Sequence, residues 1–498
     1  GCRSGDELIE LKPGLVIGES VTVRPGVYNL PAGDSLDRPV ITIMGDDIVV
    51  DFNGAQLVGA VEEQTPDSFR GLAIQVRGGS NITIRNLTAR GYKVALLAER
   101  VDSLKLFDCD LSYNYRQRLH SRRERENLAD WLSYHDNEQD QWLRYGAAVY
   151  LKDCRKAVVR GLRVTGGQNG LLLSGCDDGL FYNNDIRFNS GVGIGLYRSS
   201  GNRVMHNRLD WNVRGYSHNI YSRGQDSAGI LCYEQSSRNV FAYNSATHSG
   251  DGFFLWAGNQ TMDSGEGGCN DNIIYGNDFS YAPTNGVEVT FSRNDIVNNR
   301  LVGCRYGVWA GYSYQTLILG NTIANNSYGV AIENGNNNSI NANVFEENGA
   351  GIQLWARAEQ PADWEFAQRR DVSSRAYTIE DNVFLGTEHP LRISRSRAVE
   401  VTGNTFLDFD LLLETEVPNE GLSFAANVIN QTVGLGEALP FLDQNTIATD
   451  VDEPAPLPGN LYNTSRIQPL SDGQAAELPD TQPQGRSFIL VDQWGPYD

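Results

Sequence analysis

Glu288 is the residue of this sequence whose type and position best suit it to catalysis. It lies in the segment 286–290, which reads GVEVT, so alternation along a strand turns its side chain away from the apolar Val287. Trp256 and Trp309 take outward positions in the repeat units before and after it. Burial beside indole rings disfavours a charged carboxylate and raises its pKa, which suits a proton donor. We therefore predict that Glu288 is a general acid.

Two aspartates are candidates for a second catalytic carboxylate. Asp251 begins the strand of the preceding unit, in HSGDGF, and Asp226 ends an insertion that faces the same end of the cleft. Hydrolysis of a glycosidic bond uses one carboxyl group to protonate the leaving oxygen and another as nucleophile or as base for water. The strand spacing predicts about 6.5–9.5 Å between Asp251 and Glu288, as in inverting enzymes. His248 is predicted to orient or tune the pair.

Outward aromatic and polar side chains predict a sugar-binding platform beside these acids. Strands in stacked coils lie about 4.8 Å apart, so the outward column from Tyr197 to Trp355 would extend roughly 30 Å, which is long enough for an oligosaccharide. The alternative is ordinary packing, in which the insertions or the C-terminal tail cover the rings. The predicted substrate-binding residues are Tyr197, Arg198, His218, Arg223, Tyr233, Trp256 and Trp309.

A repeat of about 22 residues must position these side chains. Short phrases of the form IxGN or IxxN recur, and the asparagines that end them are mostly 22 or 23 residues apart, or 33 to 39 where an insertion intervenes. Such a period is the signature of a solenoid. Stacked amides can bond to one another and to the turn backbone, which predicts a ladder at one corner. Its predicted members are Asn184, Asn207, Asn244, Asn277, Asn299, Asn321, Asn343, Asn382 and Asn404.

Each repeat unit holds only strand-length runs, such as GVEVTF, GVWAGY and GVAIEN, split by turn-forming Gly, Asn, Asp and Ser. This pattern leaves no room for a helix in each unit and predicts an all-β fold, a parallel β-helix solenoid. When the units are aligned on the glycine that opens one strand, the first and third residues that follow are apolar and form the predicted core face. These residues are Ala147, Val149, Leu171, Leu173, Ile194, Leu196, Ile230, Cys232, Phe253, Leu255, Val287, Val289, Val308, Ala310, Val330, Ile332, Ile352 and Leu354.

The repeating asparagine turns and short strands resemble the right-handed parallel β-helix superfamily, which includes pectate lyases, polygalacturonases and alginate epimerases. The resemblance covers about 390 of the 498 residues and implies right-handed coils in a carbohydrate-active protein, without choosing the reaction. Bulky loops gathered on one face of a regular scaffold usually surround its site. The insertions predicted to wall one outward sheet are 112–143, 211–226, 257–270 and 356–375.

Three functions remain open. The first is a glycoside hydrolase with paired carboxylates that cleaves a polysaccharide or oligosaccharide in the groove. The second is a polysaccharide lyase or C5-epimerase acting on uronates. Many β-helix lyases use lysine as the base, but no lysine follows Lys156, so the base would be Tyr233 or His248. Arg198 or Arg223 would then neutralise the uronate. The third is a non-catalytic sugar-binding or surface-structural protein.

We predict three segments: an N-terminal cap over 1–40, the β-helix over 41–435 and a non-repetitive tail over 436–498. Caps are expected because an open strand edge invites pairing with another chain. Cys2, in GCRSGDE, looks like the mature end of a bacterial lipoprotein, which predicts a lipid anchor there. The predicted location is secreted, at the cell surface or periplasmic. No run of 18 apolar residues predicts a membrane span.

The chain is strongly acidic, with a formal net charge of −21. This balance argues against nucleic acid as a partner, because phosphate binding needs a basic surface. It also disfavours a densely anionic polysaccharide, unless arginine or a divalent cation offsets the repulsion locally. No ligand spacing predicts a metal site, and no cofactor is expected. A calcium ion with a structural or substrate-bridging role stays open.

Overall fold

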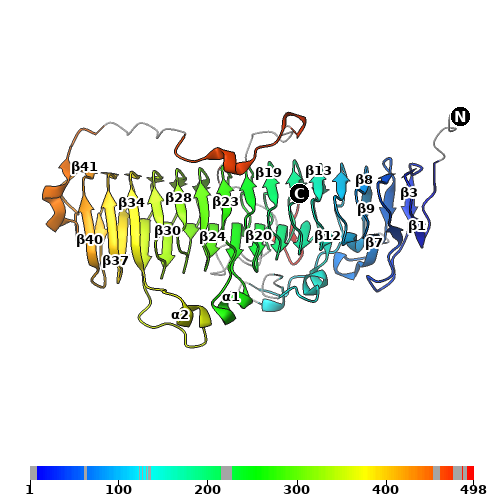
Figure 1. Ribbon diagram of the computed structural model, residues 1–498, viewed down its shortest axis with the longest axis horizontal. Coiled ribbons are helices and arrows are strands. Elements are labelled where there is room, and N and C mark those ends of the chain that lie inside the picture. Colours follow the sequence, from blue (N-terminus) through cyan, green and yellow to red (C-terminus); the bar gives the residue numbers. More distant parts are fainter. Residues whose placement is uncertain are drawn as a thin grey trace.

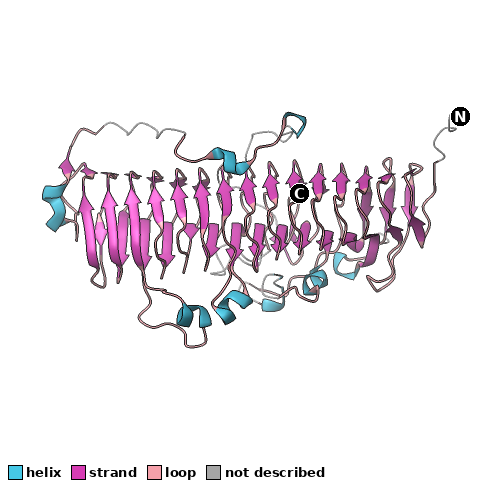
Figure 2. Ribbon diagram, in the orientation of Figure 1, coloured by secondary structure: helices cyan, strands magenta, loops and turns pink. Residues whose placement is uncertain are grey.

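The fold is a long stack of parallel β-coils. The computed structural model describes residues 8–60, 64–122, 124–125, 127–130, 132, 136–214, 227–451, 460–474, 485 and 491–498. Within these residues the chain winds through parallel sheets along one axis, with the first coils at one end and the last at the other (Figure 1). Helices are few and lie outside the stack (Figure 2). The predicted all-β parallel β-helix is confirmed.

The sheet that carries the candidate site has fifteen strands among the described residues, all parallel. Neighbouring strands belong to successive coils, so each side chain has partners in register one coil before and one coil after. The strands are β1 (Leu15–Ile17), β4 (Ile41–Ile43), β7 (Arg70–Arg77), β10 (Tyr92–Glu99), β12 (Ala147–Lys152), β15 (Leu171–Ser174), β18 (Val192–Tyr197), β20 (Ala228–Tyr233), β22 (Asp251–Trp256), β24 (Asn285–Thr290), β27 (Tyr306–Trp309), β30 (Tyr328–Glu333), β33 (Ala350–Trp355), β36 (His389–Ser394) and β39 (Leu413–Glu414).

A second sheet, also fifteen strands over the described ranges, closes another side of the coil. Its strands are β2 (Val21–Thr22), β5 (Val49–Asp51), β8 (Thr83–Arg85), β11 (Lys105–Phe107), β13 (Val158–Arg160), β16 (Leu180–Tyr182), β19 (Arg203–Met205), β21 (Val240–Ala242), β23 (Asn272–Tyr275), β25 (Asn294–Val297), β28 (Leu317–Leu319), β31 (Ser339–Asn341), β34 (Arg375–Glu380), β37 (Arg397–Thr402) and β40 (Glu420–Ala425).

The third side is built from shorter strands in separate parallel sheets. They are β3 (Val27–Asn29), β6 (Gln56–Val58) and β9 (Thr88–Arg90); β14 (Arg163–Val164) and β17 (Asp185–Ile186); and β26 (Arg300–Val302), β29 (Thr322–Ala324), β32 (Val344–Glu346), β35 (Val383–Leu385), β38 (Thr405–Leu407), β41 (Val428–Ile429) and β42 (Thr446–Ile447). An antiparallel pair, β43 (Val491–Asp492) and β44 (Gly495–Pro496), lies near the C-terminus.

The helices of the described chain are short. Two are α-helices, α1 (Asn259–Ser264) and α2 (Glu365–Arg369), and they pack against each other. The others are single 3₁₀ turns at Pro66–Ser68, Leu128–Asp130, Gln141–Tyr145, Leu439–Gln444, Thr464–Ile467 and Asp472–Gln474. In Figure 1, α1, α2 and the described part of 112–143 project from the same side of the stack. No helix in the described chain is long and apolar enough to cross a membrane.

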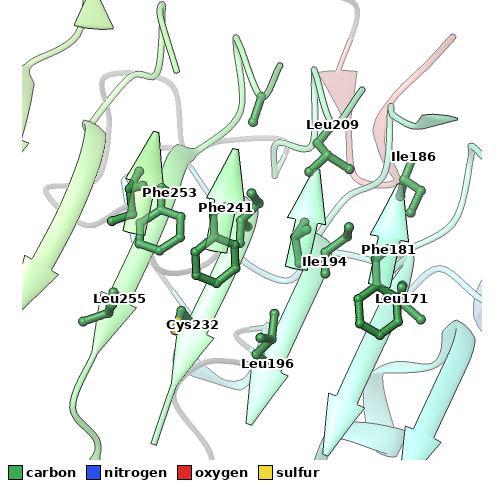
Figure 3. Packing of buried hydrophobic residues seen from close by; sticks show 14 of the residues in the cluster. Leu171, Phe181, Ile186, Ile194, Leu196, Leu209, Cys232, Phe241, Phe253 and Leu255 are labelled. Carbon is green, nitrogen blue, oxygen red and sulfur yellow. The ribbon is translucent and has the colours of Figure 1, made fainter. Parts of the chain in front are cut away.

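The predicted core face is confirmed, with one correction of register. All eighteen predicted residues are buried, and seventeen of them pack inside the coils. Figure 3 shows part of this core, including Ile194, Phe253 and Leu255. The exception is Ala147, which packs on the outer side of the sheet. Leu171 pairs with Val149, so Gly170 corresponds to Ala148 and not to Gly146. The preceding insertion shifted the sequence alignment of that coil by two residues.

A glycine recurs at the start of these strands because successive coils approach each other closely there. A Cβ atom on Gly252 would lie 2.5 Å from the Cβ atom of Phe279 and 2.6 Å from the carbonyl oxygen of Gly286. Contacts this short force the backbone to move, so a larger residue at this position would separate the coils that carry Asp251 and Glu288.

The predicted asparagine ladder is confirmed. Each of the nine side chains donates from Nδ2 to Oδ1 of the next asparagine at 2.9–3.1 Å, and the series continues through Asn427 to Asn445. The same Oδ1 atoms also accept backbone N–H groups, as Asn277 does from Asn244 at 2.9 Å. A second ladder, which the sequence analysis missed, joins Asn202, Asn239 and Asn272.

The coil boundaries differ from the predicted segments. The first strand, β1, already pairs with β4, so coil structure begins within the predicted cap. At the other end β42 pairs with β41, beyond residue 435. The tail segment that holds Tyr462 and Arg466 lies on the second sheet, where both side chains donate to Asp295 at 2.7 Å. Cys2 lies outside the described residues.

Candidate active site

The side chain of Glu288 lines a cavity of about 660 Å³ on the outer face of the first sheet. The cavity crosses six successive coils, from β20 to the residues after β33, which is about 24 Å at the usual strand spacing. Aromatic rings supply most of its wall, and a few polar groups point in among them. Its lining residues are Tyr233, Phe254, Trp256, Asn259, Glu288, Thr290, Phe291, Trp309, Gly311, Tyr312, Glu333, Arg357 and Trp364.

The strand register fixes the neighbours of Glu288. Phe254 pairs with it from the coil before, and Trp309 pairs with it from the coil after. Trp256 lies two residues further along β22 and pairs with Thr290. The structure thus brings Glu288, Trp256 and Trp309 into one cavity, with a phenylalanine in the register position next to the acid.

Asp251 and Glu288 are joined by a residue that the sequence analysis did not single out. The side-chain amide of Asn285 donates to Glu288 Oε2 at 2.8 Å and to Asp251 Oδ2 at 3.4 Å. The backbone N–H of Asn285 donates to Asp251 Oδ1 at 2.9 Å. Asn285 begins β24 directly beside Asp251, which is why one amide reaches both carboxyl groups. Asn285, the asparagine of the segment TNGVEV, was the feature of the sequence that could have indicated this link between the two acids.

The electrostatic environment of Glu288 favours its protonated form. Burial among apolar rings raises the pKa of Glu288 well above its ordinary value, and the negative charge of nearby Asp251 raises it further. A raised pKa favours the protonated form, from which a carboxyl group can donate a proton. The role of Glu288 as general acid stays a prediction.

Asp251 itself does not reach the cavity. Its side chain is fully buried, and it does not line the cavity. Because its Oδ2 and Glu288 Oε2 bind the same nitrogen at 3.4 Å and 2.8 Å, these two oxygens are at most 6.2 Å apart. That limit is shorter than the spacing of about 6.5–9.5 Å expected for an inverting pair. The inverting geometry predicted for Asp251 and Glu288 is not what these oxygens adopt, because a shared amide draws the two groups together.

A second carboxylate faces the cavity from the other direction. Glu333 ends β30, and its Oε1 accepts hydrogen bonds from Arg357 Nε at 2.8 Å and from Trp355 Nε1 at 3.2 Å. Arg357 comes from the insertion 356–375, so the loop and the sheet build this corner together. The sequence analysis did not single out Glu333. Arg357, two residues after Trp355, was the feature of the sequence that could have indicated this contact with Glu333.

The insertions supply an aromatic wall. Trp364 and Phe366 from 356–375 pack edge-on against Phe291, at ring-centroid distances of 5.5 Å and 5.1 Å. Tyr312 stacks on Phe291 at 4.8 Å and donates its hydroxyl proton to Gln360 Oε1 at 2.7 Å. One side of the cavity is thus walled by loops, as predicted.

The predicted platform residues Tyr197 and Tyr233 are covered rather than open. Both are almost fully buried, and Trp142 from the insertion 112–143 packs edge-on against them at 5.4 Å and 6.1 Å. Tyr233 contributes to the cavity lining, whereas Tyr197 does not. Arg198 also lies outside the lining, and its guanidinium donates to Glu138 at 2.6 Å. The alternative of ordinary packing beneath an insertion therefore describes this end of the column.

His248 lies outside the cavity lining. Its ring is stacked between Trp211 at 4.0 Å and Tyr281 at 4.9 Å, and Nε2 is 2.8 Å from the carbonyl oxygen of Gly485. The structure gives it a packing contact with the C-terminal tail. The remaining predicted site residues, His218, Arg223 and Asp226, lie outside the described residues.

We expect Glu288→Gln to change how stability depends on pH. Above the ordinary glutamate pKa, the folded state retains a proton on Glu288 that the unfolded chain releases, so wild-type stability falls as pH rises through the raised pKa. Glutamine cannot ionise, so the variant should lose this decline and melt above wild type at high pH. Melting temperatures measured from about pH 4 to about pH 9 test this. Parallel curves for the two proteins would contradict the raised pKa.

Comparison with protein families agrees with this architecture. Residues 72–246 match the family described as right handed beta helix region. The chain is a right-handed parallel β-helix. Residues 229–362 also match the family described as periplasmic copper-binding protein (NosD). No curated protein matches the sequence.

Solved structures with related coils share little sequence with this β-helix. A double mutant of the periplasmic alginate epimerase AlgG is 12% identical over 81% of this chain and 79% of that one, with a TM-score of 0.42. The A-module of an Azotobacter vinelandii mannuronan C-5 epimerase is 14% identical over 82% and 91%, at 0.37. A DFA-IIIase mutant from Arthrobacter chlorophenolicus A6, in complex with DFA-III, is 12% identical over 78% and 82%, at 0.39. Likeness at this level does not extend to function.

The name of the second family implies a copper site, so we compared the metal-binding side chains of the described residues with those that copper prefers. Protein copper sites draw on histidine, cysteine and methionine ligands. The described residues contain no group of three or more His, Cys, Asp or Glu side chains that could hold a metal ion. The six described cysteines are all buried. The donor set in the described part of the β-helix therefore does not fit copper.

Proposed function

We propose that this β-helix is a glycoside hydrolase that cleaves a polysaccharide or oligosaccharide in the cavity over β22, β24, β27 and β30. The observation that carries the proposal is a carboxyl group with a raised pKa among the aromatic residues that line the groove. Burial and the charge of Asp251 raise the pKa of Glu288, which favours its protonated form. Protonation of the leaving oxygen is what the first carboxyl group of a glycosidase supplies.

Glu333 is the second carboxylate of the proposal. It lies two coils from Glu288 and two residues further along the strand, so the two backbones are about 12 Å apart at ordinary strand spacings. Trp309 lies in the coil between them. Side chains that converge over this ring could approach the spacing of about 6.5–9.5 Å that leaves room for a water molecule. Arg357 Nε donates a hydrogen bond to Glu333 Oε1 at 2.8 Å, which orients this carboxyl group at the edge of the cavity.

Asp251 takes a different role from the one predicted from sequence. Because its side chain has no exposed surface, it acts on the substrate only through its neighbours. Its charge raises the pKa of Glu288, and its bonds to Asn285 hold the amide that orients Glu288. We assign Asp251 and Asn285 as positioning residues for the general acid.

The cavity suits a neutral or weakly charged sugar better than a polyuronate. Arg357, the one arginine in its lining, is paired with Glu333. The net charge of −21 repels a polyanion at longer range. A lyase or C5-epimerase would also need a base, and burial raises the pKa of Tyr233, which makes its phenolate harder to form. These observations rank the lyase second and a non-catalytic binder third.

We expect Trp309→Ala to weaken substrate binding by about tenfold or more. This indole is partly exposed and pairs in register with Glu288, and removing its contact with a sugar should cost at least about 1.4 kcal/mol. KM for the cleaved oligosaccharide, or its affinity by calorimetry, measures the effect. Tyr243→Asn on the second sheet is the matched control, because Tyr243 is an exposed aromatic far from the cavity lining. An unchanged affinity in the Trp309 variant would remove this ring from the platform.

A panel of polysaccharides tests the reaction itself. Xylan, arabinan, β-glucan, inulin, polygalacturonate and alginate are incubated with the protein, and both new reducing ends and the ultraviolet absorbance of an unsaturated product are recorded. The proposal expects new reducing ends from a neutral polymer without that absorbance. Absorbance from a uronate would favour a lyase, and a change in uronate configuration without cleavage would favour an epimerase. Binding without either change would favour a binder.

The acidic surface again argues against nucleic acid as a partner. A secreted or periplasmic location is part of the proposal, supported by the match of residues 229–362 to a family named for a periplasmic protein. We propose no cofactor for the reaction, since general acid–base hydrolysis of a glycoside requires none.

A further inference from the structure

We propose that the groove receives the end of a sugar chain at Glu288, and that the rest of the chain leaves over the C-terminal coils. This inference rests on the proposed hydrolase function and specifies its substrate as a chain terminus. It follows from an asymmetry of the first sheet. On the N-terminal side of Glu288 the outward face is covered, whereas on the C-terminal side it is partly exposed at Trp309, Gln353 and Trp355, with Ala331 buried between them.

The N-terminal side of the groove is closed by the insertion 112–143. In the register column of Glu288, Phe254 is 2% exposed, and the residues of earlier coils, Leu231 and Leu172, are fully buried. A second outward column lies two residues further along each strand. It is also covered toward the N-terminal coils, because Tyr233 and Tyr197 are almost fully buried. A sugar chain that continued in this direction would have to displace packed side chains.

Trp142 is the centre of this closure, and it is held firmly. Its backbone N–H donates to Asn137 Oδ1 at 2.9 Å, and Asn137 donates to the hydroxyl oxygens of Tyr150 at 2.8 Å and Ser174 at 3.1 Å. Tyr150 in turn donates to Asp140 at 2.8 Å. These bonds fasten the insertion to outward residues of β12 and β15.

A charged contact adds to this anchorage. Lys152, the last residue of β12, donates to Asp140 at 2.6 Å. The covering segment is therefore tied to the sheet by buried polar bonds as well as by the indole ring. We infer that it is a fixed end wall.

The C-terminal side of the groove offers exposed aromatic surface. Trp309 and Trp355 are both partly exposed, and their ring centroids lie 5.7 Å apart. Tyr306 and Tyr328 stack beside them at 5.0 Å. Gln353 is also partly exposed in the register column of Glu288. Successive sugar rings could rest on this strip over β27, β30 and β33.

The position of Glu288 within the groove sets the size of the product. Tyr233, the most N-terminal residue of the lining, lies two coils before Glu288 and two residues further along the strand, so the two backbones are about 12 Å apart at ordinary strand spacings. This distance accommodates a terminal sugar unit or a short oligosaccharide, and not a continuing polymer. In the reaction, the last glycosidic C–O bond breaks, the anomeric carbon takes the hydroxyl of water, and the other sugar oxygen takes a proton. Small sugars should therefore be released from one end.

The time course of products tests this inference. The polymer that the wild type degrades in the panel is digested while its viscosity and the sizes of its products are followed. We expect one small product from the first turnovers, with a viscosity that falls only in proportion to the sugar released. Early mixed oligosaccharides and a rapid fall in viscosity would overturn the chain-end inference alone. A panel in which no polymer yields new reducing ends would overturn the proposed function, and this inference with it.

Two variants examine the two ends of the groove separately. Trp355→Ala removes part of the exit strip and one hydrogen bond to Glu333, so kcat/KM should fall for every substrate, and by about tenfold more for a hexasaccharide than for a disaccharide. Trp142→Ala weakens the end wall, and it should produce internal cleavage products that the wild type does not make. If the Trp142 variant fails to fold, the length dependence of the Trp355 variant still decides. Equal losses on long and short substrates in that variant would overturn the inferred direction of the chain.

Discussion

Glu288→Gln should lower kcat on an unactivated oligosaccharide by about 10²–10⁴-fold, the usual contribution of a general acid. Glutamine preserves the shape of the side chain and can still accept the hydrogen bond that Asn285 donates to Glu288 Oε2 at 2.8 Å. It has no proton to give to a leaving oxygen. Substrate affinity should change little, because the aromatic wall of the groove is untouched. Initial rates and equilibrium binding measured on the same oligosaccharide separate the two effects.

A matched variant guards this result against a general effect of charge removal. Glu266 lies in the insertion beside α1, is exposed and does not line the cavity. Glu266→Gln should keep wild-type activity. The wild-type rate should also fall as pH rises through the raised pKa of Glu288, because the acid is active only while protonated. Near-wild-type turnover in the Glu288 variant would refute its role as proton donor.

Asn277→Ala should destabilise the β-helix by about 3 kcal/mol or more. Asn277 is buried, and its amide donates to the Phe241 carbonyl at 2.9 Å and to Asn299 Oδ1 at 3.0 Å. Its Oδ1 accepts the backbone N–H and the side-chain amide of Asn244. Alanine would leave several buried polar groups without partners, at about 1–3 kcal/mol for each one. Urea unfolding measures the loss.

Asn29→Ala is the control for the ladder variant. Asn29 lies at an exposed position at the end of β3. Its replacement should change the free energy of unfolding by no more than about 0.5 kcal/mol. Equal stabilities for the two variants would mean that the ladder contributes no more than a surface asparagine does.

The coil architecture could be predicted from sequence because it repeats. An inward residue such as Val287 has an equivalent in every coil, so alternation within strands and periodicity between them identify the same core face. The ladder was predictable for the same reason, since Asn277 and its neighbours recur at the coil period. Glu288 could be placed on the outer face because strand parity leaves it no other direction.

The chemistry around Glu288 depends on contacts that no repeat encodes. Trp142 covers Tyr197 because an insertion of unique sequence folds back on the sheet. Arg357 reaches Glu333 from another insertion. Neither contact has an equivalent in other coils, so periodicity offered no guide to them. The two-residue shift at Gly146 has the same origin, because an insertion precedes that strand.

The contact between Asp251 and Glu288 could be predicted only in part from the sequence. The sequence placed both acids near one strand end, and the structure confirms that they are neighbours. It did not show that Asn285 joins them or that Asp251 is fully buried. Complete burial of one carboxyl group and partial exposure of the other depend on packing at the start of the strand, which alternation alone does not determine.

The most direct test of the account is a crystal structure of the Glu288→Gln variant with the shortest oligosaccharide that the wild type cleaves. The account predicts a sugar ring on Trp309, with a glycosidic oxygen within hydrogen-bond distance of residue 288 and the chain continuing toward Trp355. A sugar bound outside this groove, or one whose glycosidic oxygens lie far from residue 288, would contradict it.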